Sequence, residues 1–383
     1  MNINIRSLIR AYSPELFGIR RALQKSKLKK LHRMILKENI ILKAENDPLY
    51  KQTIIEAWLS NNKEKYKPLI EEAKNCGGGD AKLQNDIIFC FLAYGFIPSE
   101  YVSFNFSSKS VKERNTYISD VETLIFGYSV NNIRALQYLL DKSKMVERYK
   151  NYLNRDYALI GKTDFYSFSN FVKKHHSFIK KNIFSSKGQG VEKVVVDNDA
   201  NLHNLFNSLV NKRKVLLEEI IVQHKIMALF NESSVNTIRV ISLKLKNEVV
   251  IPWAILRTGR KNEVVDNAGH GGIVAGINII TGIVETDGID EQGIVYFRHP
   301  DSKKAFKGTI IPFFNQLIDI CLEIHNKEKE LGYLSFDMAL NENGYWCVVE
   351  VNDVGQLILP QMAYQRGIKK EIYRYNRDMN QYI

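Results

Sequence analysis

The sequence predicts a mixed α+β protein in which a mainly helical N-terminal region precedes a part rich in strands. Hydrophobic residues make up 45% of the 383 residues and charged residues 25%, an ordinary globular composition at a length of roughly two or three domains. Residues 1 to about 75 alternate apolar and charged positions at helical spacing. From residue 126 to about 375, short apolar runs bounded by turn residues indicate strands.

No segment is predicted to span a membrane or to act as a secretion signal. The longest apolar runs, such as residues 87–93, are far shorter than the ~18–20 residues of a membrane helix, and the first residues lack an apolar signal core. The cysteines include no Cys-x-x-Cys pair, so neither a disulfide framework nor a zinc site is predicted. We expect a cytoplasmic protein with reduced thiols.

Positive charge is concentrated at the N-terminus. The net charge is +12, and residues 1–33 contain nine lysines and arginines against one acid, Glu15. Because the rest of the chain is nearly balanced, a nucleic-acid partner is not predicted. Apolar residues interleaved in this stretch leave two interpretations of residues 6–33. We prefer a solvated basic helix; the alternative is an amphipathic segment in peripheral contact with the inner membrane.

Helices are predicted from apolar periodicity and from glycines. Three glycines within residues 76–80 end the first helical zone. A short apolar helix is expected at 87–94, followed by an irregular aromatic stretch. Apolar residues recur at helical spacing over 133–153 and 311–331, and Gly332 is predicted to end the second of these helices.

Strands are predicted where β-branched, aliphatic and aromatic residues form short runs between turn residues. These runs lie at residues 178–181, 191–196, 215–221, 238–245, 249–256, 334–340 and 346–351. The last two runs flank Asn343-Gly344, the favoured dipeptide for a two-residue type I′ hairpin turn. With that turn Glu342 pairs with Tyr345, which fixes the register of the hairpin.

In this register three oxygen-bearing side chains share one face of the hairpin. Asp337 lies directly opposite Glu350, and Asn352 follows Glu350 by two residues. Hard oxygen donors of this kind suit Mg²⁺, usually together with phosphate oxygens. The alternative is an edge hairpin with a solvated acidic face.

A glycine-rich loop is predicted between the strands at 178–181 and 191–196. Its residues Gly188 and Gly190 can fold backbone N–H groups over phosphates, and Lys180 on the preceding strand could add a positive charge. The loop is not a P-loop, because no Gly-Lys-Ser/Thr is present and no helix follows. The alternative is an ordinary hairpin with a glycine turn.

The strand expected at 215–221 carries two adjacent carboxylates, Glu218 and Glu219. Such a strand could present backbone groups to the edge of a nucleobase and a carboxylate to a ribose. The alternative is a half-buried strand whose acids lie on its solvated face.

Two arginines are candidates for contact with an anion. Arg239 lies within an apolar strand, where a guanidinium needs an anionic partner, and Arg257 follows the next apolar strand. The segment 265–276 contains Asn267 among glycines that let a backbone approach a ligand closely. For either arginine the alternative is a structural ion pair.

Other catalytic templates are absent. The sequence contains no HExxH or GxSxG motif and no GxGxxG after a strand. The adjacent His175 and His176 are expected at the surface and not as ligands.

Taken in chain order, these segments resemble the ATP-grasp superfamily, and more closely the sugar-transfer-associated ATP-grasp proteins of bacterial surface-polysaccharide loci. The segments that carry the resemblance are YGFIPSEYVSFNF, LLDKSK, SVNTIRV, LRTG, VDNAGHGGIVAG, FDMAL and GYWCVVEVN, within about residues 90–365. The resemblance implies an ATP-grasp fold, in which two α+β subdomains hold ATP. Residues 1–75 lie outside the resemblance. We expect a mainly helical N-terminal region over 1–125, a first ATP-grasp part with the glycine loop over 126–222 and a second part with the metal hairpin over 223–383.

The resemblance also implies residue roles. It assigns ATP binding to Lys142, Lys180, Ser185, Ser186, Gly188, Gly190, Glu218, Glu219 and Ile221, contact with the phosphoryl group and acceptor to Arg239, Arg257 and Asn267, and Mg²⁺ to Asp337, Glu350 and Asn352. The family's usual Lys-Pro is Lys180-Lys181 here, so either lysine can face the nucleotide; we expect Lys180. Lys162 is the alternative to Lys142.

The activity implied is that of an ATP-dependent carboxylate–amine ligase. A substrate carboxylate takes the γ-phosphoryl group of ATP, and an amine then displaces phosphate to leave an amide, with ADP as the other product. We expect the carboxylate to belong to a small-molecule or lipid-linked glycan precursor of a capsule or O-antigen. The alternatives are an ATP-grasp kinase that phosphorylates a sugar hydroxyl, and a non-enzymatic basic scaffold at an anionic membrane.

Overall fold

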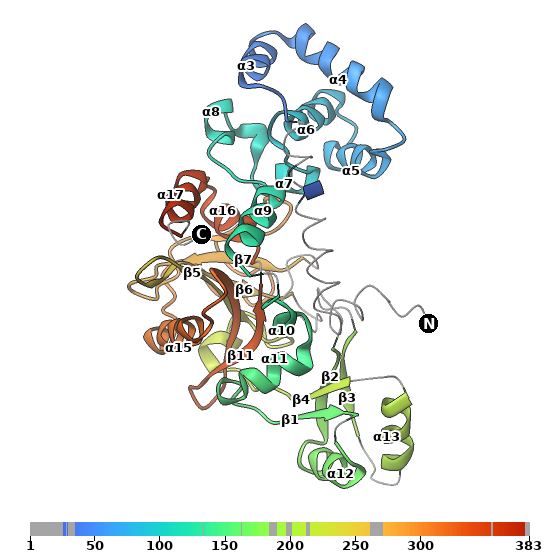
Figure 1. The fold of residues 1–383 in the computed structure, drawn as a ribbon, viewed down its shortest axis with the longest axis vertical. Coiled ribbons are helices and arrows are strands. Elements are labelled where there is room, and N and C mark those ends of the chain that lie inside the picture. Colours follow the sequence, from blue (N-terminus) through green and yellow to red (C-terminus); the bar gives the residue numbers. More distant parts are fainter. Residues whose placement is uncertain are drawn as a thin grey trace.

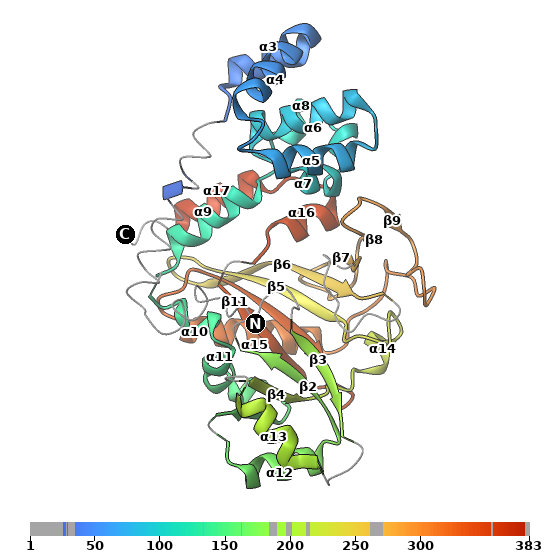
Figure 2. The same ribbon diagram turned by 90° about the vertical axis from the view of Figure 1, so that its right-hand side faces the viewer.

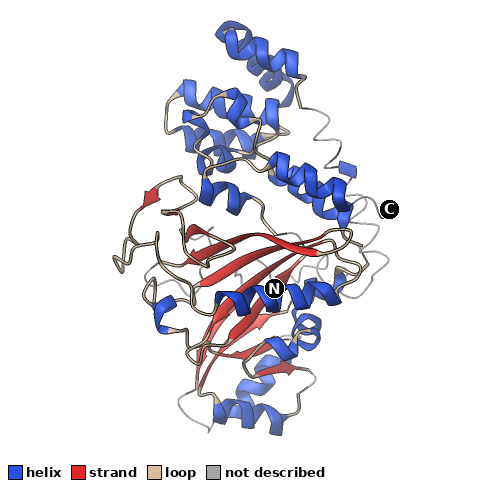
Figure 3. Cartoon of the chain, turned by 90° about the vertical axis from the view of Figure 1, so that its left-hand side faces the viewer, coloured by secondary structure: helices blue, strands red, loops and turns tan. Residues whose placement is uncertain are grey.

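The computed structural model describes residues 26–27, 29, 35–132, 134–161, 163–183, 190–196, 201–211, 215–260, 271–353 and 355–379. These residues form a helical region, a large sheet and a small sheet, which follow one another along the longest axis of the molecule (Figure 1). Helices lie at both ends and against the sheets (Figure 3). The predicted α+β class with a helical N-terminal region is confirmed.

Capping residues define several helices of the N-terminal region. Asp47 begins α4 by accepting hydrogen bonds from the backbone N–H groups of Leu49 and Tyr50, and Asp80 caps α6 in the same way. α6 ends at Gly95, whose φ of 78° is a left-handed conformation that suits glycine. The helices are α3 (Glu38–Asn46), α4 (Pro48–Asn62), α5 (Lys67–Gly77), α6 (Ala81–Tyr94), α7 (Pro98–Ser103), α8 (Val111–Arg114) and α9 (Asp120–Val130).

The aromatic stretch 94–106, which we expected to be irregular, contains the short helix α7, and the two helices after it, α8 and α9, were not predicted. Ser110 and Glu113 start α8 by a reciprocal pair of hydrogen bonds, in which each side chain accepts from the other residue's backbone N–H. Ser119 and Glu122 start α9 in the same way. Ser-x-x-Glu is a sequence signal for the start of a helix, so the sequence contained the information that our prediction missed.

The helical region and the large sheet share one apolar core. Phe89, Phe104 and Phe106 are fully buried in the helical region, and the same cluster contains Ile255 and Val274 of the large sheet. α16 (Ile358–Tyr364) lies between the N-terminal helices and this sheet (Figure 2). Burial of this shared apolar surface stabilises both regions together.

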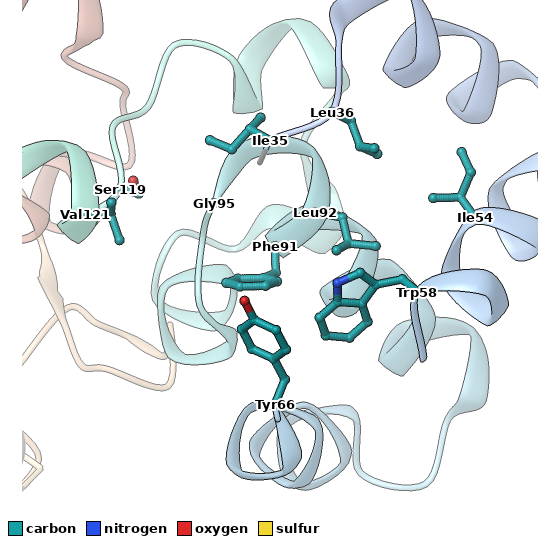
Figure 4. A pocket seen from close by; sticks show the side chains of 10 residues that line it. All are labelled: Ile35, Leu36, Ile54, Trp58, Tyr66, Phe91, Leu92, Gly95, Ser119 and Val121. Atoms are coloured by element: carbon teal, nitrogen blue, oxygen red, sulfur yellow. The ribbon is translucent and has the colours of Figure 1, made fainter. Parts of the chain in front are cut away.

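A small apolar pocket lies within the helical region. Its volume is about 130 Å³, and the rings of Trp58, Tyr66 and Phe91 meet at its wall, with centroids 5.1–6.0 Å apart (Figure 4). The other lining residues are Ile35, Leu36, Ile54, Leu92, Gly95, Ser119 and Val121. Since no predicted site residue is among them, the pocket is separate from the candidate site.

The small sheet has two different faces. One face, with Phe178 and Leu217, packs on two helices, whereas the opposite face, with Leu159 and Leu216, belongs to the core beneath the large sheet. The strands are antiparallel in the order β1 (Tyr157–Ile160), β4 (Val215–Glu219), β2 (Ser177–Asn182) and β3 (Val191–Val195), and the helices are α12 (Phe165–Lys174) and α13 (Leu202–Asn211).

The large sheet is antiparallel throughout, in the order β11-β10-β5-β6-β7-β8-β9. Leu317 and Cys321 of α15 pack on one face, and Ile372 of α17 packs on the other. The elements are β5 (Thr237–Lys244), β6 (Val249–Thr258), β7 (Ile273–Ile277), β8 (Gly288–Ile289), β9 (Val295–Tyr296), β10 (Tyr333–Leu340), β11 (Trp346–Asn352), α15 (Phe314–Lys327) and α17 (Lys369–Met379).

Every predicted strand is present, with ends that differ by at most two residues. The helical periodicity over 133–153 gives α10 (Gln137–Leu140), α11 (Lys142–Arg148) and a short 3₁₀ turn instead of one helix. The interruption lies at Asp141, whose side chain caps α11. β1, β7, β8 and β9 were not predicted.

Gly332 does not end the helix before it, as was predicted. α15 stops at Lys327, and the backbone N–H of Gly332 donates to the carbonyl of Val130 in α9 (3.2 Å). A Cβ at this position would lie 2.6 Å from that carbonyl oxygen. The glycine is therefore needed for close packing of two segments and not for a helix cap.

The hairpin of β10 and β11 has a different turn from the predicted one. Its loop is residues 342–344: the backbone N–H of Asn341 donates to the carbonyl of Tyr345 (3.0 Å), and that of Gly344 donates to the carbonyl of Asn341 (3.0 Å). Gly344 has a φ of 83°, whereas Asn343 is not left-handed. A type I′ turn needs positive φ at both, so that prediction is wrong.

A β-bulge nevertheless restores the predicted pairing at the site. Met338 pairs with Val348, one residue out of the predicted register. Val349 is an extra residue in β11, after which Asp337 lies opposite Glu350 as predicted. The three-residue loop and the bulge therefore compensate each other.

In the part of the chain that the structure describes, no helix is both long and apolar enough to cross a membrane. The four cysteines, all within this part, are free thiols as expected, and Cys90, Cys321 and Cys347 are buried.

Candidate functional site

Three predicted site residues form a buried ion-pair cluster on adjacent strands of the large sheet. Asp337 on β10 accepts two hydrogen bonds from Arg239 on β5, one of them 2.8 Å from Nη2 to Oδ2, and Nη1 of Arg257 on β6 lies 3.1 Å from Oδ1. Burial alone would raise the pKa of the Asp337 carboxyl, but the two guanidinium groups outweigh it and lower that pKa to about 2.

Both arginines thus have the anionic partner that the ion-pair alternative requires. Their predicted contact with a phosphoryl group stays a prediction.

Glu350 pairs with Lys142, the predicted upstream lysine. The Nζ of Lys142 lies 2.7 Å from Oε1 of Glu350, and its backbone N–H donates to the carbonyl of Ile183 (3.3 Å) just after β2. The predicted metal ligand, the predicted lysine and the strand that leads into the predicted glycine loop therefore lie together. Lys162, the alternative, lies outside the described residues.

Two buried polar atoms beside these carboxylates have no hydrogen-bond partner among the described residues. They are Nδ2 of Asn352 and Oγ of Ser335, which lie opposite each other on β11 and β10. Because a half-turn exchanges the two ends of an amide, Asn352 can present its oxygen at this position. Two carboxylates and an amide oxygen are the donor set that Mg²⁺ prefers, so the residues present fit the predicted ion.

Glu218 is buried at the end of β4, on the face of the small sheet that lies toward the large sheet. Arg155 and Lys181 both form ion pairs with its carboxylate. Burial would raise the pKa of Glu218, but these two cations outweigh it and lower the pKa to about 2. The predicted ribose-binding carboxylate is therefore held as an anion, and the half-buried Ile221 follows it beyond the strand end.

Glu219 lies on the other side of β4 and has different partners. Its Oε2 accepts a hydrogen bond from the backbone N–H of Asp156 (2.9 Å), and its Oε1 is 4.0 Å from Nδ1 of His175. His175 is only 10% exposed and its Nε2 is 2.8 Å from Asp156 Oδ2, so its predicted surface position is wrong. Asp156, His175 and Glu219 could together hold a metal ion, but Lys174 already pairs with Asp156 (2.5 Å), and we assign none.

The structure corrects the choice between the two adjacent lysines of β2. Lys180 shares a face with the buried Phe178, against the helices, and its Nζ pairs with Glu192 of β3 (2.5 Å). Lys181 points the opposite way and pairs with Glu218. The geometry therefore favours Lys181, and not Lys180, beside the candidate site.

Four predicted residues lie outside the described residues, and a fifth lies at their edge. Gly190 is exposed directly before β3 and has a φ of 73°, as expected for a glycine turn. Those outside are Ser185, Ser186, Gly188 and Asn267.

Sequence reasoning missed Arg155. It lies in the polar stretch between α11 and β1, where no motif or periodicity marks it. Its role depends on partners that are 63 and 193 residues away in the chain, Glu218 and Val348.

A model of the sugar-transfer associated ATP-grasp family matches residues 126–377. No curated protein matches the sequence. Among solved structures, D-alanyl-alanine synthetase A from Vibrio cholerae is similar at 11% identity with a TM-score of 0.40, over 65% of this chain and 68% of that one.

Two other solved structures are similar to a comparable degree. N5-carboxyaminoimidazole synthetase from Staphylococcus aureus, complexed with ADP, is 11% identical with a TM-score of 0.37, over 60% of this chain and 48% of that one. The ATP-grasp ligase PsnB with its minimal precursor is 11% identical with a TM-score of 0.41, over 70% of this chain and 71% of that one. The chain thus spans about half the length of the N5-carboxyaminoimidazole synthases that it matches.

Proposed function

The chain belongs to the sugar-transfer associated ATP-grasp family, and from this premise we propose that it is an ATP-dependent ligase that joins a carboxylate to an amine. One observation carries the proposal: Asp337, Glu350 and Asn352 lie on one face of a hairpin within reach of Lys142, Arg239 and Arg257. A group of oxygen ligands surrounded by cations is what transfer of a phosphoryl group requires.

Each part of the site has a proposed task. Glu218 and Ile221 bind the ribose and base of ATP, and Lys142 and Lys181 neutralise its phosphates. The proposed cover over these phosphates is the glycine loop, with Ser185, Ser186, Gly188 and Gly190. Asp337, Glu350 and Asn352 would hold Mg²⁺, which would supply a Lewis acid that neutralises negative charge during phosphoryl transfer.

The proposed task of the arginines is to stabilise negative charge during the reaction. Arg239 and Arg257, with Asn267, steady the γ-phosphoryl group as the substrate carboxylate attacks phosphorus and ADP leaves. The amine then attacks the acyl phosphate, phosphate leaves and an amide remains. Exclusion of water under the loop protects the acyl phosphate from hydrolysis.

The substrate is proposed on the family description alone: a carboxylate of a glycan precursor, free or lipid-linked, and an amine, in the synthesis of a capsule or O-antigen. We also propose that the protein is cytoplasmic and that residues 6–33, which lie largely outside the described residues, contact an anionic membrane peripherally. Flotation of the protein with anionic but not with neutral vesicles would support that contact.

Calorimetric titration with ADP and ATP, with and without Mg²⁺, tests the nucleotide site. We expect Mg²⁺ to tighten binding, and Glu350→Gln to lose at least about tenfold of that gain. Glu342→Gln, on the exposed tip of the same hairpin, is the control and should bind as wild type does. Equal Mg²⁺ effects in both variants would refute the metal assignment.

Trapping with hydroxylamine tests the reaction class. When a carboxylate substrate is present, an acyl phosphate gives a hydroxamate, and we expect it to appear in step with ADP. Substrate-dependent ADP formation with a stable phosphorylated product and no hydroxamate would instead show the kinase alternative.

A further inference from the structure

Arg155 connects the two sheets at the candidate site. Its side chain is 3% exposed, and its Nε donates to Oε1 of Glu218 on β4 (3.0 Å). Its Nη1 donates to the carbonyl of Val348 on β11 (2.7 Å) and to that of Leu153 (3.2 Å). One planar guanidinium therefore contacts the small sheet, the large sheet and its own loop.

The contact with β11 lies directly before the metal-ligand end of that strand. Val348 is followed by the bulge residue Val349 and then by Glu350. The preceding loop residue, Asn154, holds the same strand, since its Nδ2 donates to the carbonyl of Trp346 (2.7 Å). Asn154 has a φ of 45°, a left-handed conformation that costs free energy and persists only where surrounding contacts impose it.

The contact with β4 continues in the next residue. The backbone N–H of Asp156 donates to Oε2 of Glu219 (2.9 Å), and the N–H of Glu219 donates to the carbonyl of Asp156 (2.9 Å). Residues 154–156 thus hold both carboxylates at the end of β4 on one side and two carbonyls of β11 on the other.

We infer that Arg155 is a positioning residue, which fixes the orientation of Glu218 and sets the place of β11, and with it Glu350, relative to the bound nucleotide. The inference rests on the proposed function, because it needs Glu218 at the nucleotide and Glu350 at the metal ion. The side chain of Arg155 therefore couples nucleotide binding at Glu218 to metal binding at Glu350.

A purely structural ion pair would behave differently from a positioning residue. It would change the stability of the fold and leave the nucleotide affinity of the folded protein as it was. Arg148 of α11 provides a control at a more exposed ion pair. Its guanidinium forms two hydrogen bonds with Glu328 (2.6 Å each), and the described contacts link it to neither Glu218 nor β11.

The experiment compares Arg155→Gln, Arg155→Lys and Arg148→Gln by calorimetry with ADP, with and without Mg²⁺, after thermal melts confirm that each variant is folded at the assay temperature. We expect Arg155→Gln to weaken ADP binding by about 10- to 100-fold, the effect of one charge-assisted hydrogen bond. We expect Arg148→Gln to bind ADP within about threefold of wild type.

Arg155→Lys separates the two functions of the side chain. An ammonium still neutralises Glu218, so part of the ADP affinity should return. It lacks the second arm that reaches the carbonyl of Val348, so the tightening by Mg²⁺ should remain reduced. In a Glu218→Gln background, Arg155→Gln should change Mg²⁺-free ADP affinity by less than about threefold, because its partner is already gone.

Three results would overturn the inference while leaving the proposed function intact. These are equal ADP affinities in Arg155→Gln and Arg148→Gln, identical Mg²⁺ effects in Arg155→Lys and wild type, and full additivity of the Glu218→Gln and Arg155→Gln effects. Absence of ADP binding by the folded wild-type protein would overturn the proposed function itself, and the inference with it.

Discussion

Lys142 occupies the place at Glu350 that the proposed function gives to a magnesium ion. Its Nζ is 2.7 Å from the carboxylate, and both side chains are only partly exposed, at 14% and 34%. On the proposed function, we therefore expect Glu350 to exchange partners when nucleotide and Mg²⁺ bind: the Lys142 ammonium would pair with the phosphates, and the Glu350 carboxylate would hold the ion. In the nucleotide-free protein we expect the Lys142 ammonium to compete with Mg²⁺ for Glu350.

This competition predicts an unusual phenotype for Lys142→Met. Nucleotide-free protein should bind Mg²⁺ about three- to tenfold more tightly than wild type, because the competing cation is gone, while ATP binds more weakly. Titration of Mn²⁺ as a spectroscopic substitute measures the first effect, and calorimetry with ATP measures the second. Lys150→Met, at an exposed lysine just beyond α11, should change neither. Weaker metal binding in Lys142→Met would contradict the exchange.

Asp337 links the site to the pH dependence of stability. Its pKa of about 2 in the folded protein lies below the ordinary value of 3.8, so it stabilises the fold above pH 3.8 and this contribution, about 2 kcal/mol, is lost as the pH falls toward 2. We expect Asp337→Asn to destabilise the protein at pH 7 by about 3–5 kcal/mol, because two buried guanidinium groups lose their partner.

Urea unfolding between pH 7 and pH 2 measures both effects. The variant should show a smaller loss of stability with acid than wild type, although Glu218, whose pKa is also lowered to about 2, keeps part of the dependence in both proteins. Parallel pH profiles would show that Asp337 is not the titrating group.

At the scale of single elements, substitutions in the loop between β10 and β11 distinguish the observed three-residue loop from the predicted type I′ turn. Gly344→Ala should lower the free energy of unfolding by about 1–2 kcal/mol, because alanine is strained at a φ of 83°. Asn343→Ala should cost less than about 0.5 kcal/mol, since Asn343 is not left-handed. In a type I′ turn both substitutions would be costly. Chemical denaturation of the two variants decides between the turns.

The same hairpin shows what the sequence could and could not predict. Asp337 opposite Glu350 was predicted from alternation and a turn dipeptide, and the pairing is correct only because a bulge at Val349 offsets the extra loop residue. Bulges depend on packing between strands, which one sequence does not display. The orientation of Lys181 toward the candidate site was missed for a related reason. Alternation places Lys180 and Lys181 on opposite faces of β2, but only the packing of helices against one face shows which lysine lies on the other.

At the scale of the whole molecule, the helical region and the large sheet of the ATP-grasp part share one apolar core. The family match begins at residue 126, which lies within α9, yet contacts across this point are extensive. The side chain of the buried Gln361 bonds both the N–H (2.8 Å) and the carbonyl (2.9 Å) of Ile118. Long-range contacts of this kind have no local signal, so the predicted boundary at 125/126 could not take them into account.

We therefore expect the fragment 126–383 not to fold by itself, although it contains nearly all of the family match. Removal of residues 1–125 would expose Ile255 and Val274 and take away the two hydrogen bonds that Gln361 makes with Ile118, so apolar burial is lost and the buried side-chain oxygen of Gln361 is left without a partner. A fragment that begins at residue 35 keeps the shared core and should bind ADP with Mg²⁺ as the full chain does. Circular dichroism and calorimetry of the two fragments test this. A folded fragment 126–383 with full ADP affinity would show instead that the catalytic part is autonomous and that the helices only dock on it.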